Sequence, residues 1–392
     1  MLTSLTLIFL LGILLGAIFK RLGLPSLIGM LIGGILLSPH VLNLLDPSIL
    51  AISADLRELA LIIILTRAGL SLDIADLRKI GRPAVLMSFV PACFEMAATI
   101  ALAPWLFGIS LLDAAILAAV IASASPAVIV PRMIRLIDEG WGADKNIPQL
   151  IMTGDSVDDV FNICVFTSLL GLSRGEKISA VRFAEIPISI VTGIAAGMLI
   201  GLVLSKLFKL MKARDSVLVL IILSAAFLLA ALEGALKGHL AFSGLIGVMA
   251  AGVSIYKLDA PLAGRLSAKL SKLWVGAEVL LFVLVGAQLD ITYAASAGVK
   301  TLLMLAVILS ARAAGILLCL LRTNLNARER LFCTFTGIPK ATVQAAIGGI
   351  PLAMGMASGE LILAVAVVTI LVSAPLGAML IDRTYKRLLE KG

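Results

Sequence analysis

The sequence predicts an all-α polytopic membrane protein, and three observations lead to that fold class. The 392 residues are 60% hydrophobic and only 14% charged, with a mean hydropathy of +1.11, so charge is too scarce to cover a soluble domain. Apolar stretches long enough to cross a hydrocarbon core of about 30 Å recur from end to end. Short motifs of the first half also recur in the second half, about 217 residues later.

Thirteen stretches have the length and composition of membrane-spanning helices, and they leave no polar segment for a second domain. The expected spans are 2–19, 24–43, 55–72, 82–107, 112–134, 148–171, 183–211, 215–234, 240–257, 270–289, 298–321, 330–352 and 359–381. Most of the 32 basic residues fall in alternate connections, which predicts an N-terminus outside and a C-terminus in the cytoplasm. The first span lacks the basic flank and cleavage site of a signal peptide, so we expect it to be retained in a bacterial-type inner or plasma membrane.

The net charge of +8 and the four cysteines bear on the class of function. The basic residues are scattered between spans instead of forming one patch, so we expect no nucleic-acid partner. The cysteines lie inside apolar spans without metal-ligand spacing, so we expect free thiols and no cofactor.

The repeated motifs relate two sets of six spans. Residues 27–29 (Leu-Ile-Gly) recur at 245–247, and residues 69–73 (Gly-Leu-Ser-Leu-Asp) recur as Gly-Ala-Gln-Leu-Asp at 286–290. Spans one to six then correspond to spans eight to thirteen, with 183–211 as a linker helix. Because this shift of seven spans is odd, the second copy is inverted in the membrane. Inverted six-helix repeats are typical of secondary transporters, which bind their ions near the middle of the membrane.

Each repeat contains one helix with an expected break. The fifth span carries Ser123, Ser125 and Pro126, and the twelfth carries Pro339 and Thr342. Proline lacks a backbone donor and leaves carbonyl groups unpaired, which is tolerated at membrane depth only where protein or a wet cavity satisfies them. An ordinary kink explains either proline alone. Two breaks at equivalent positions favour two crossing half-helices, whose carbonyls and hydroxyls can help to bind a cation.

The sixth span carries ionisable residues that are costly in a membrane, about 3 kcal/mol each at its centre. Asp158 and Asp159 lie well inside this helix. As consecutive residues they point about 100° apart and can serve different partners. Asp155 lies one turn before Asp159, where it can either line an entrance to the site or face water near the helix end.

Three further charges inside spans are expected to be partners of these carboxylates. Glu95 and Arg312 occupy repeat-equivalent positions, so we expect them to pair, and we expect Asp158 to pair with Lys340 at the second break. Asp159 is then left with an uncompensated charge, for which a small monovalent cation and a proton can compete. The alternative is that all five residues form purely structural ion pairs.

Four stretches, taken together, match a known pattern in order and spacing. They are 125–131 (Ser-Pro-Ala-Val-Ile-Val-Pro), 145–150 (Lys-Asn-Ile-Pro-Gln-Leu), 154–159 with its two terminal aspartates, and 338–348, which contains Pro-Lys-Ala-Thr-Val-Gln-Ala-Ala. These stretches resemble the NHA-type sodium/proton antiporters of the cation/proton antiporter superfamily. The resemblance covers the whole chain.

The resemblance implies a homodimer of thirteen-helix subunits, each with a dimerisation domain and a six-helix core that moves like an elevator. It implies that Asp159 binds the ion and that Asp158 is its partner. Arg312 stands where many relatives carry a lysine that competes with the ion. Because arginine keeps its proton at physiological pH, the expected titrating groups are the carboxylates or Lys340.

We therefore expect a secondary transporter, not an enzyme, that exchanges Na⁺ or Li⁺ for H⁺ across a lipid bilayer and serves pH homeostasis. The residues expected to hold the ion are Asp159, Asp158, Thr342 and Ser125. Within this single unit, 1–392, the expected scaffold helices are 1–72 and 215–289, and the expected mobile core is 82–171 with 298–381.

Three other functions are compatible with parts of this pattern. Potassium/proton exchange and sodium-coupled uptake of an organic anion would use the same fold. An intramembrane aspartate enzyme is a remote alternative, because a prenyl transferase needs a third acid in a DDxxD motif, whereas Val160, Phe161 and Asn162 follow the doublet. A membrane protease needs its two aspartates on facing helices.

Overall fold

The computed structural model describes residues 1–72, 81–173, 180–211, 213–236 and 241–391. These residues form helices joined by short connections, with one isolated β-bridge between Trp141 and Lys391. Asp73 of the second repeated motif and residue 240 of the ninth expected span lie outside the described residues.

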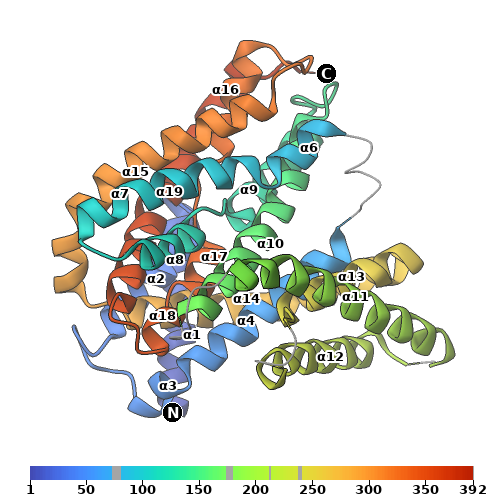
Figure 1. The fold of residues 1–392 in the computed structure, drawn as a ribbon, viewed down its shortest axis with the longest axis horizontal. Helices are drawn as coiled ribbons and strands as arrows, with labels where there is room; N and C mark the ends of the chain where they lie inside the picture. Colours follow the sequence, from blue (N-terminus) through green and yellow to red (C-terminus); the bar gives the residue numbers. More distant parts are fainter. Residues whose placement is uncertain (73–80, 174–179, 212, 237–240, 392) are drawn as a thin grey trace. The chain divides into compact units, whose positions relative to one another are not determined.

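The helices follow one another in the order drawn in Figure 1. Their bounds are α1 (Leu2–Arg21), α2 (Ser26–Leu37), α3 (Pro47–Ala51), α4 (Ser53–Ser71), α6 (Arg82–Met87), α7 (Val90–Phe107), α8 (Leu111–Ile121), α9 (Pro126–Glu139), α10 (Ile147–Ser173), α11 (Ala180–Leu210), α12 (Asp215–Ala235), α13 (Gly244–Leu258), α14 (Ala260–Ala287), α15 (Ile291–Cys319), α16 (Ala327–Thr336), α17 (Thr342–Ile347), α18 (Ile350–Ala353) and α19 (Gly359–Leu388). Every expected span overlaps at least one of them.

Eight of the described helical segments are long and apolar enough to cross a membrane by length and composition. They are Leu2–Arg21, Arg82–Phe107, Leu111–Glu139, Ile188–Leu210, Asp215–Ala235, Ala260–Ala287, Ile291–Cys319 and Gly359–Leu388. The other expected spans coincide with shorter apolar helices, such as α2 and α13, or with helices that carry several charges, such as α4 and α10.

Two helices end earlier than the apolar pattern predicts. Helix α2 stops at Leu37, well before residue 43, because Ser38 precedes Pro39 and adopts an extended backbone (φ −60°, ψ 158°). The span 82–107 is interrupted between α6 and α7, where Pro91 has no N–H to donate to the carbonyl of Met87. Proline therefore sets both boundaries.

The chain forms two compact units, each assembled from separate segments. One unit consists of Met1–Ala54, Asp76–Phe166 and Val279–Gly392, and the other of Asp55–Ala75 and Thr167–Glu278. In the first unit α7 packs along α15, while α19 contacts α8, α9, α15 and α16 (Figure 1). In the second unit α13 packs against α11 and α12.

Two equivalent pairs of helices approach each other closely at glycines. In the first unit, a Cβ added at Gly34 of α2 would clash with the backbone of Val283 in α14. In the second unit, a Cβ added at Gly252 of α13 would clash with the backbone of Gly69 in α4. By the repeated motifs, α13 is the counterpart of α2 and α14 is the counterpart of α4. The contact between α2 and α14 therefore corresponds to the contact between α13 and α4. In each contact, a helix of one repeat packs against a helix of the other repeat.

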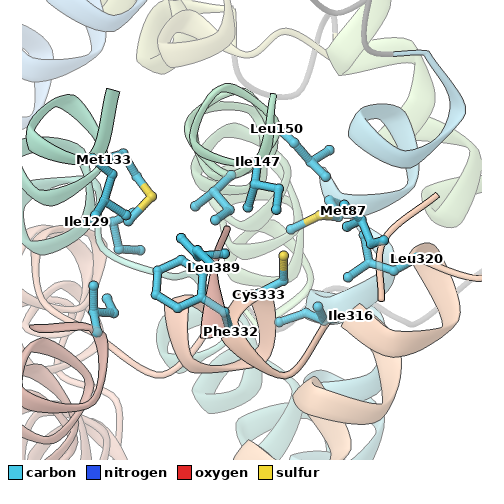
Figure 2. Close-up of a cluster of buried hydrophobic side chains, with 14 of the residues drawn as sticks. Met87, Ile129, Met133, Ile147, Leu150, Ile316, Leu320, Phe332, Cys333 and Leu389 are labelled. Atoms are coloured by element: carbon cyan, nitrogen blue, oxygen red, sulfur yellow. The ribbon is translucent and has the colours of Figure 1, made fainter. Parts of the chain in front are cut away.

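A buried apolar cluster in the first unit fixes the start of the helix that carries the aspartates. Figure 2 shows Ile147 and Leu150, from the first turn of α10, among side chains that include Met87 of α6 and Phe332 of α16. Leu389, directly after α19, packs into the same cluster. Close packing of this kind resists displacement, so the cluster holds α10 in register with the two broken helices.

Candidate functional site

The two expected helix breaks are present, and they meet. The first separates α8 from α9 and covers residues 122–125, and the second separates α16 from α17 and covers residues 337–341. The N–H of Ser125 in the first break donates to the carbonyl of Pro339 in the second, at 2.9 Å. Backbone groups that a continuous helix would pair internally are therefore paired across the crossing.

Protein donors contact both carboxylate oxygens of Asp158 in α10. Its Oδ2 accepts from Nη2 of Arg312 at 2.7 Å and from the N–H of Ala124 in the first break at 3.1 Å. The amide of Asn162, one turn later, donates to the Asp158 carbonyl at 2.7 Å and lies 3.3 Å from Oδ1. The side chain of Asp158 is completely buried, so its charge is balanced by a fixed arginine.

Glu95 shares one oxygen between two bases. Its Oε2 lies 3.1 Å from Nη1 of Arg312 and 2.6 Å from Nζ of Lys340. The expected contact between Glu95 and Arg312 is thus present, but the expected pairing of Asp158 with Lys340 is wrong. The guanidinium presents two Nη groups that reach two carboxylates at once, whereas the single Nζ of Lys340 is turned toward Glu95 and the Ala122 carbonyl.

Asp159 differs from its neighbour in both exposure and partners. It is partly exposed, and its Oδ1 is hydrogen-bonded by the hydroxyl of Ser123. Among the described residues, no lysine or arginine forms an ion pair with Asp159. Two acids and two bases balance one another in the buried network of Glu95, Asp158, Arg312 and Lys340, and the charge of Asp159 lies outside it.

Asp155 is buried, 5% exposed, one helical turn before Asp159. Its Oδ2 has no hydrogen-bond partner among the described residues. The water-facing position that the sequence left open for Asp155 is therefore not observed in this conformation.

Two hydroxyls at the crossing are buried and uncommitted. Ser125 precedes α9, and Thr342 opens α17; within the described part of the chain, neither Oγ of Ser125 nor Oγ1 of Thr342 has a hydrogen-bond partner. Carboxylate and hydroxyl oxygens are the hard ligands that suit a small alkali cation. The described residues contain no group of three or more His, Cys, Asp or Glu side chains placed to hold a metal ion.

Sequence reasoning assigned no role to two buried amides at this site. Asn162 holds Asp158 as described, and Gln344 of α17 donates to carbonyls of the first break. Both are polar amides inside apolar spans, and this feature of the sequence could have indicated a role for them. The partner of Asn162 lies four residues earlier on the same helix, at a spacing visible in the sequence. The partners of Gln344 depend on helix packing and are not visible in the sequence.

Comparison with known proteins identifies the family. The model of the family described as "Sodium/hydrogen exchanger, transmembrane" matches residues 6–386. This chain belongs to the sodium/hydrogen exchanger family. The resemblance that the motifs indicated is confirmed, and the chain is an integral multi-pass membrane protein of a transporter family, not an enzyme.

Curated relatives of this chain carry names of the same family. Sodium/hydrogen exchanger 9B2 of Xenopus tropicalis is 33% identical over 354 residues, which are 86% of this chain and 64% of the relative. The mouse 9B2 protein is 31% identical over 389 residues, which are 94% of this chain and 69% of the relative. This chain thus spans about two thirds of the length of these relatives.

A solved structure shows the same fold. The sodium proton antiporter MjNhaP1 from Methanocaldococcus jannaschii at pH 8 superposes with a TM-score of 0.85, over 98% of this chain and 97% of that chain. The two sequences are only 20% identical, so this likeness concerns the fold alone.

Proposed function

We propose that this chain exchanges Na⁺ or Li⁺ for protons, and that the cation and the proton compete for Asp159. The observation that carries the proposal is the contrast between the two adjacent aspartates. Asp158 is buried and held by Arg312, while Asp159 is partly exposed and forms no ion pair with the described residues. A lone carboxylate at membrane depth is costly unless a proton or a cation neutralises it.

The proposed ligands of the cation are side-chain oxygens around the crossing. Asp159 provides the charge, and the uncommitted hydroxyls of Ser125 and Thr342 provide neutral oxygens. Asp158 shapes the site through the Ala124 N–H and Arg312, and contributes to the ion through its field more than through direct contact. We propose that Asp155 lines the approach to Asp159 on the same face of α10.

The transport cycle that fits this site is alternating access. We propose thirteen membrane helices in two inverted repeats, because each of the thirteen expected spans overlaps at least one described helix and the same glycine contact occurs in both repeats. Helices within 82–171 and 298–381 would form the mobile core, and those within 1–72 and 215–289 the scaffold of a homodimer, with 183–211 as the linker. The distribution of basic residues supports an N-terminus outside and a C-terminus in the cytoplasm.

The proposal is tested with purified protein in vesicles that contain a pH-sensitive dye. A Na⁺ gradient should drive proton movement with the unchanged chain, and Asp159→Asn should reduce it to the level of protein-free vesicles. Asp113→Asn, which alters an acid in the first turn of α8 outside the site, is the matched control and should retain exchange. Sodium-driven proton movement that persists in Asp159→Asn refutes the role of this carboxylate.

The same vesicles separate the other transport functions. Proton movement driven by K⁺ but not by Na⁺ would identify potassium/proton exchange. Sodium entry that depends on an added organic anion, without proton movement, would identify symport.

A further inference from the structure

The first helix break frees three backbone carbonyls at the centre of the site. In a continuous helix, the carbonyls of Ile121, Ala122 and Ser123 would accept from the N–H groups four residues later. The N–H of Ser125 instead donates to Pro339, and Pro126 has no N–H at all. Free carbonyls at membrane depth are strong potential ligands for a dehydrated cation.

Protein donors occupy all three of these carbonyls. The amide nitrogen of Gln344 lies 2.8 Å from the Ser123 oxygen and 3.3 Å from the Ile121 oxygen. The Ala122 oxygen accepts from Arg312 and, at 3.2 Å, from Lys340. While the network is intact, these hydrogen bonds make the carbonyls less available to a cation.

The burial and orientation of Gln344 suit it to donate to the carbonyls of Ile121 and Ser123. Gln344 is completely buried in α17, just after the second break. Its Nε2 faces two carbonyl oxygens, and the reversed amide would place Oε1 against them, so the hydrogen-bond network fixes the orientation. Unlike Arg312 and Lys340, Gln344 occupies carbonyls without adding charge.

We propose that Gln344 is a specificity-determining residue, which keeps the carbonyls of Ile121 and Ser123 away from the transported ion. This inference rests on the proposed cation exchange. With those carbonyls withheld, the ion meets only a few carboxylate and hydroxyl oxygens, which favours the smaller Na⁺ and Li⁺. A larger ion such as K⁺ needs more oxygens to replace its hydration shell, and rings of backbone carbonyls are the groups that supply them.

The test compares ion preference in vesicles for the unchanged chain and Gln344→Met, which keeps the length of the side chain but removes both N–H groups. The apparent affinities for Na⁺, Li⁺ and K⁺ are measured from ion-driven proton movement. We expect the preference for Na⁺ over K⁺ to fall about tenfold, the factor that corresponds to one ordinary hydrogen bond. Gln288→Met, which removes an amide that donates to Ser53 at 3.0 Å outside the site, should keep the original preference.

A second variant covers the case in which Gln344→Met does not fold. Gln344→Glu has the same shape, and its carboxyl can donate to a carbonyl only when protonated. We expect ion preference close to that of the unchanged chain at low pH and a loss of preference as the pH rises. An unaltered preference in Gln344→Met, or in Gln344→Glu at every pH, overturns the inference.

The outcome also separates this inference from the proposed function. If the unchanged chain shows no exchange, or if Asp159→Asn retains it, the proposed function fails. If both behave as proposed while the Gln344 variants keep the original ion preference, only the role of Gln344 fails.

Discussion

Replacing Arg312 with methionine would remove the side chain that joins the two buried carboxylates. Arg312 contacts Asp158 at 2.7 Å and Glu95 at 3.1 Å, and it is 2% exposed. Glu95 would keep Lys340 at 2.6 Å, but Asp158 would have no base among the described residues. Breaking a buried ion pair from one side costs about 3–5 kcal/mol, because the remaining charge is left uncompensated. We expect Arg312→Met to lower the free energy of unfolding by that amount.

Removing the stranded charge should recover much of this loss. In Arg312→Met combined with Asp158→Asn, the remaining ion pair of Glu95 and Lys340 is balanced. The asparagine can still accept from the Ala124 N–H through its side-chain oxygen. We expect the double variant to lose about 2 kcal/mol less free energy of unfolding than the two single variants lose together. A coupling of this size is typical of side chains in direct contact.

The assay is chemical unfolding of the purified variants in mixed micelles, analysed as a double-mutant cycle. Arg82→Met is the matched control, because Arg82 is an arginine that donates to the Leu321 carbonyl at 3.3 Å and forms no part of the network. If the two single losses add within about 0.5 kcal/mol, Arg312 and Asp158 are not coupled and the assignment of charges at the site is refuted.

Two further predictions concern stability away from the site. Glu329 raises the pKa of Lys145 above its ordinary value of 10.5 through a 2.7 Å hydrogen bond, so this pair stabilises the fold fully below about pH 10.5 and less as the pH rises further. Lys145→Met should therefore lower the thermal midpoint most at neutral pH. A difference in thermal midpoint between the variant and the unchanged chain that stays constant above pH 10.5 would contradict this. Gly34→Ala should lower the free energy of unfolding by about 1–3 kcal/mol, because its Cβ would clash with the Val283 backbone. Gly298→Ala, where a Cβ meets no atom within 4 Å, should stabilise α15 by about 0.5–1 kcal/mol, and equal effects of the two substitutions would argue against the close helix approach.

The sequence predicted the features that arise from local chemistry. Pro126 and Pro339 mark the two breaks because proline lacks a donor wherever it stands, and the different surroundings of Asp158 and Asp159 agree with their positions about 100° apart on one helix. The family was also predictable, because each of its motifs is a short stretch of consecutive residues. The ends of helices were less predictable. Pro39 stops α2 inside an apolar stretch, whereas hydropathy alone would continue the helix through it.

The identity of the charge pairs could not be predicted, because it depends on distances between helices far apart in the chain. Repeat symmetry suggested that Arg312 meets Glu95, and it does. Repeat symmetry does not determine which base pairs with Asp158. The choice depends on side-chain shape, since a forked guanidinium can serve two carboxylates whereas an ammonium group binds at a single point. For the same reason Gln344 drew no assignment from its sequence context alone.

The balanced network gives a physical reason for two adjacent aspartates in the proposed exchange. Because Asp158 is held by Arg312 and by the Ala124 N–H, it anchors α10 to the first break whatever the state of the ion site. In the proposed cycle, the competition between cation and proton acts on a carboxylate whose position is already fixed by its neighbour. A single aspartate would have to do both, and each proton that neutralised it would also weaken the contact between α10 and the break. Under the proposed mechanism, dividing the two tasks lets the charge at Asp159 change while the crossing of the half-helices stays intact.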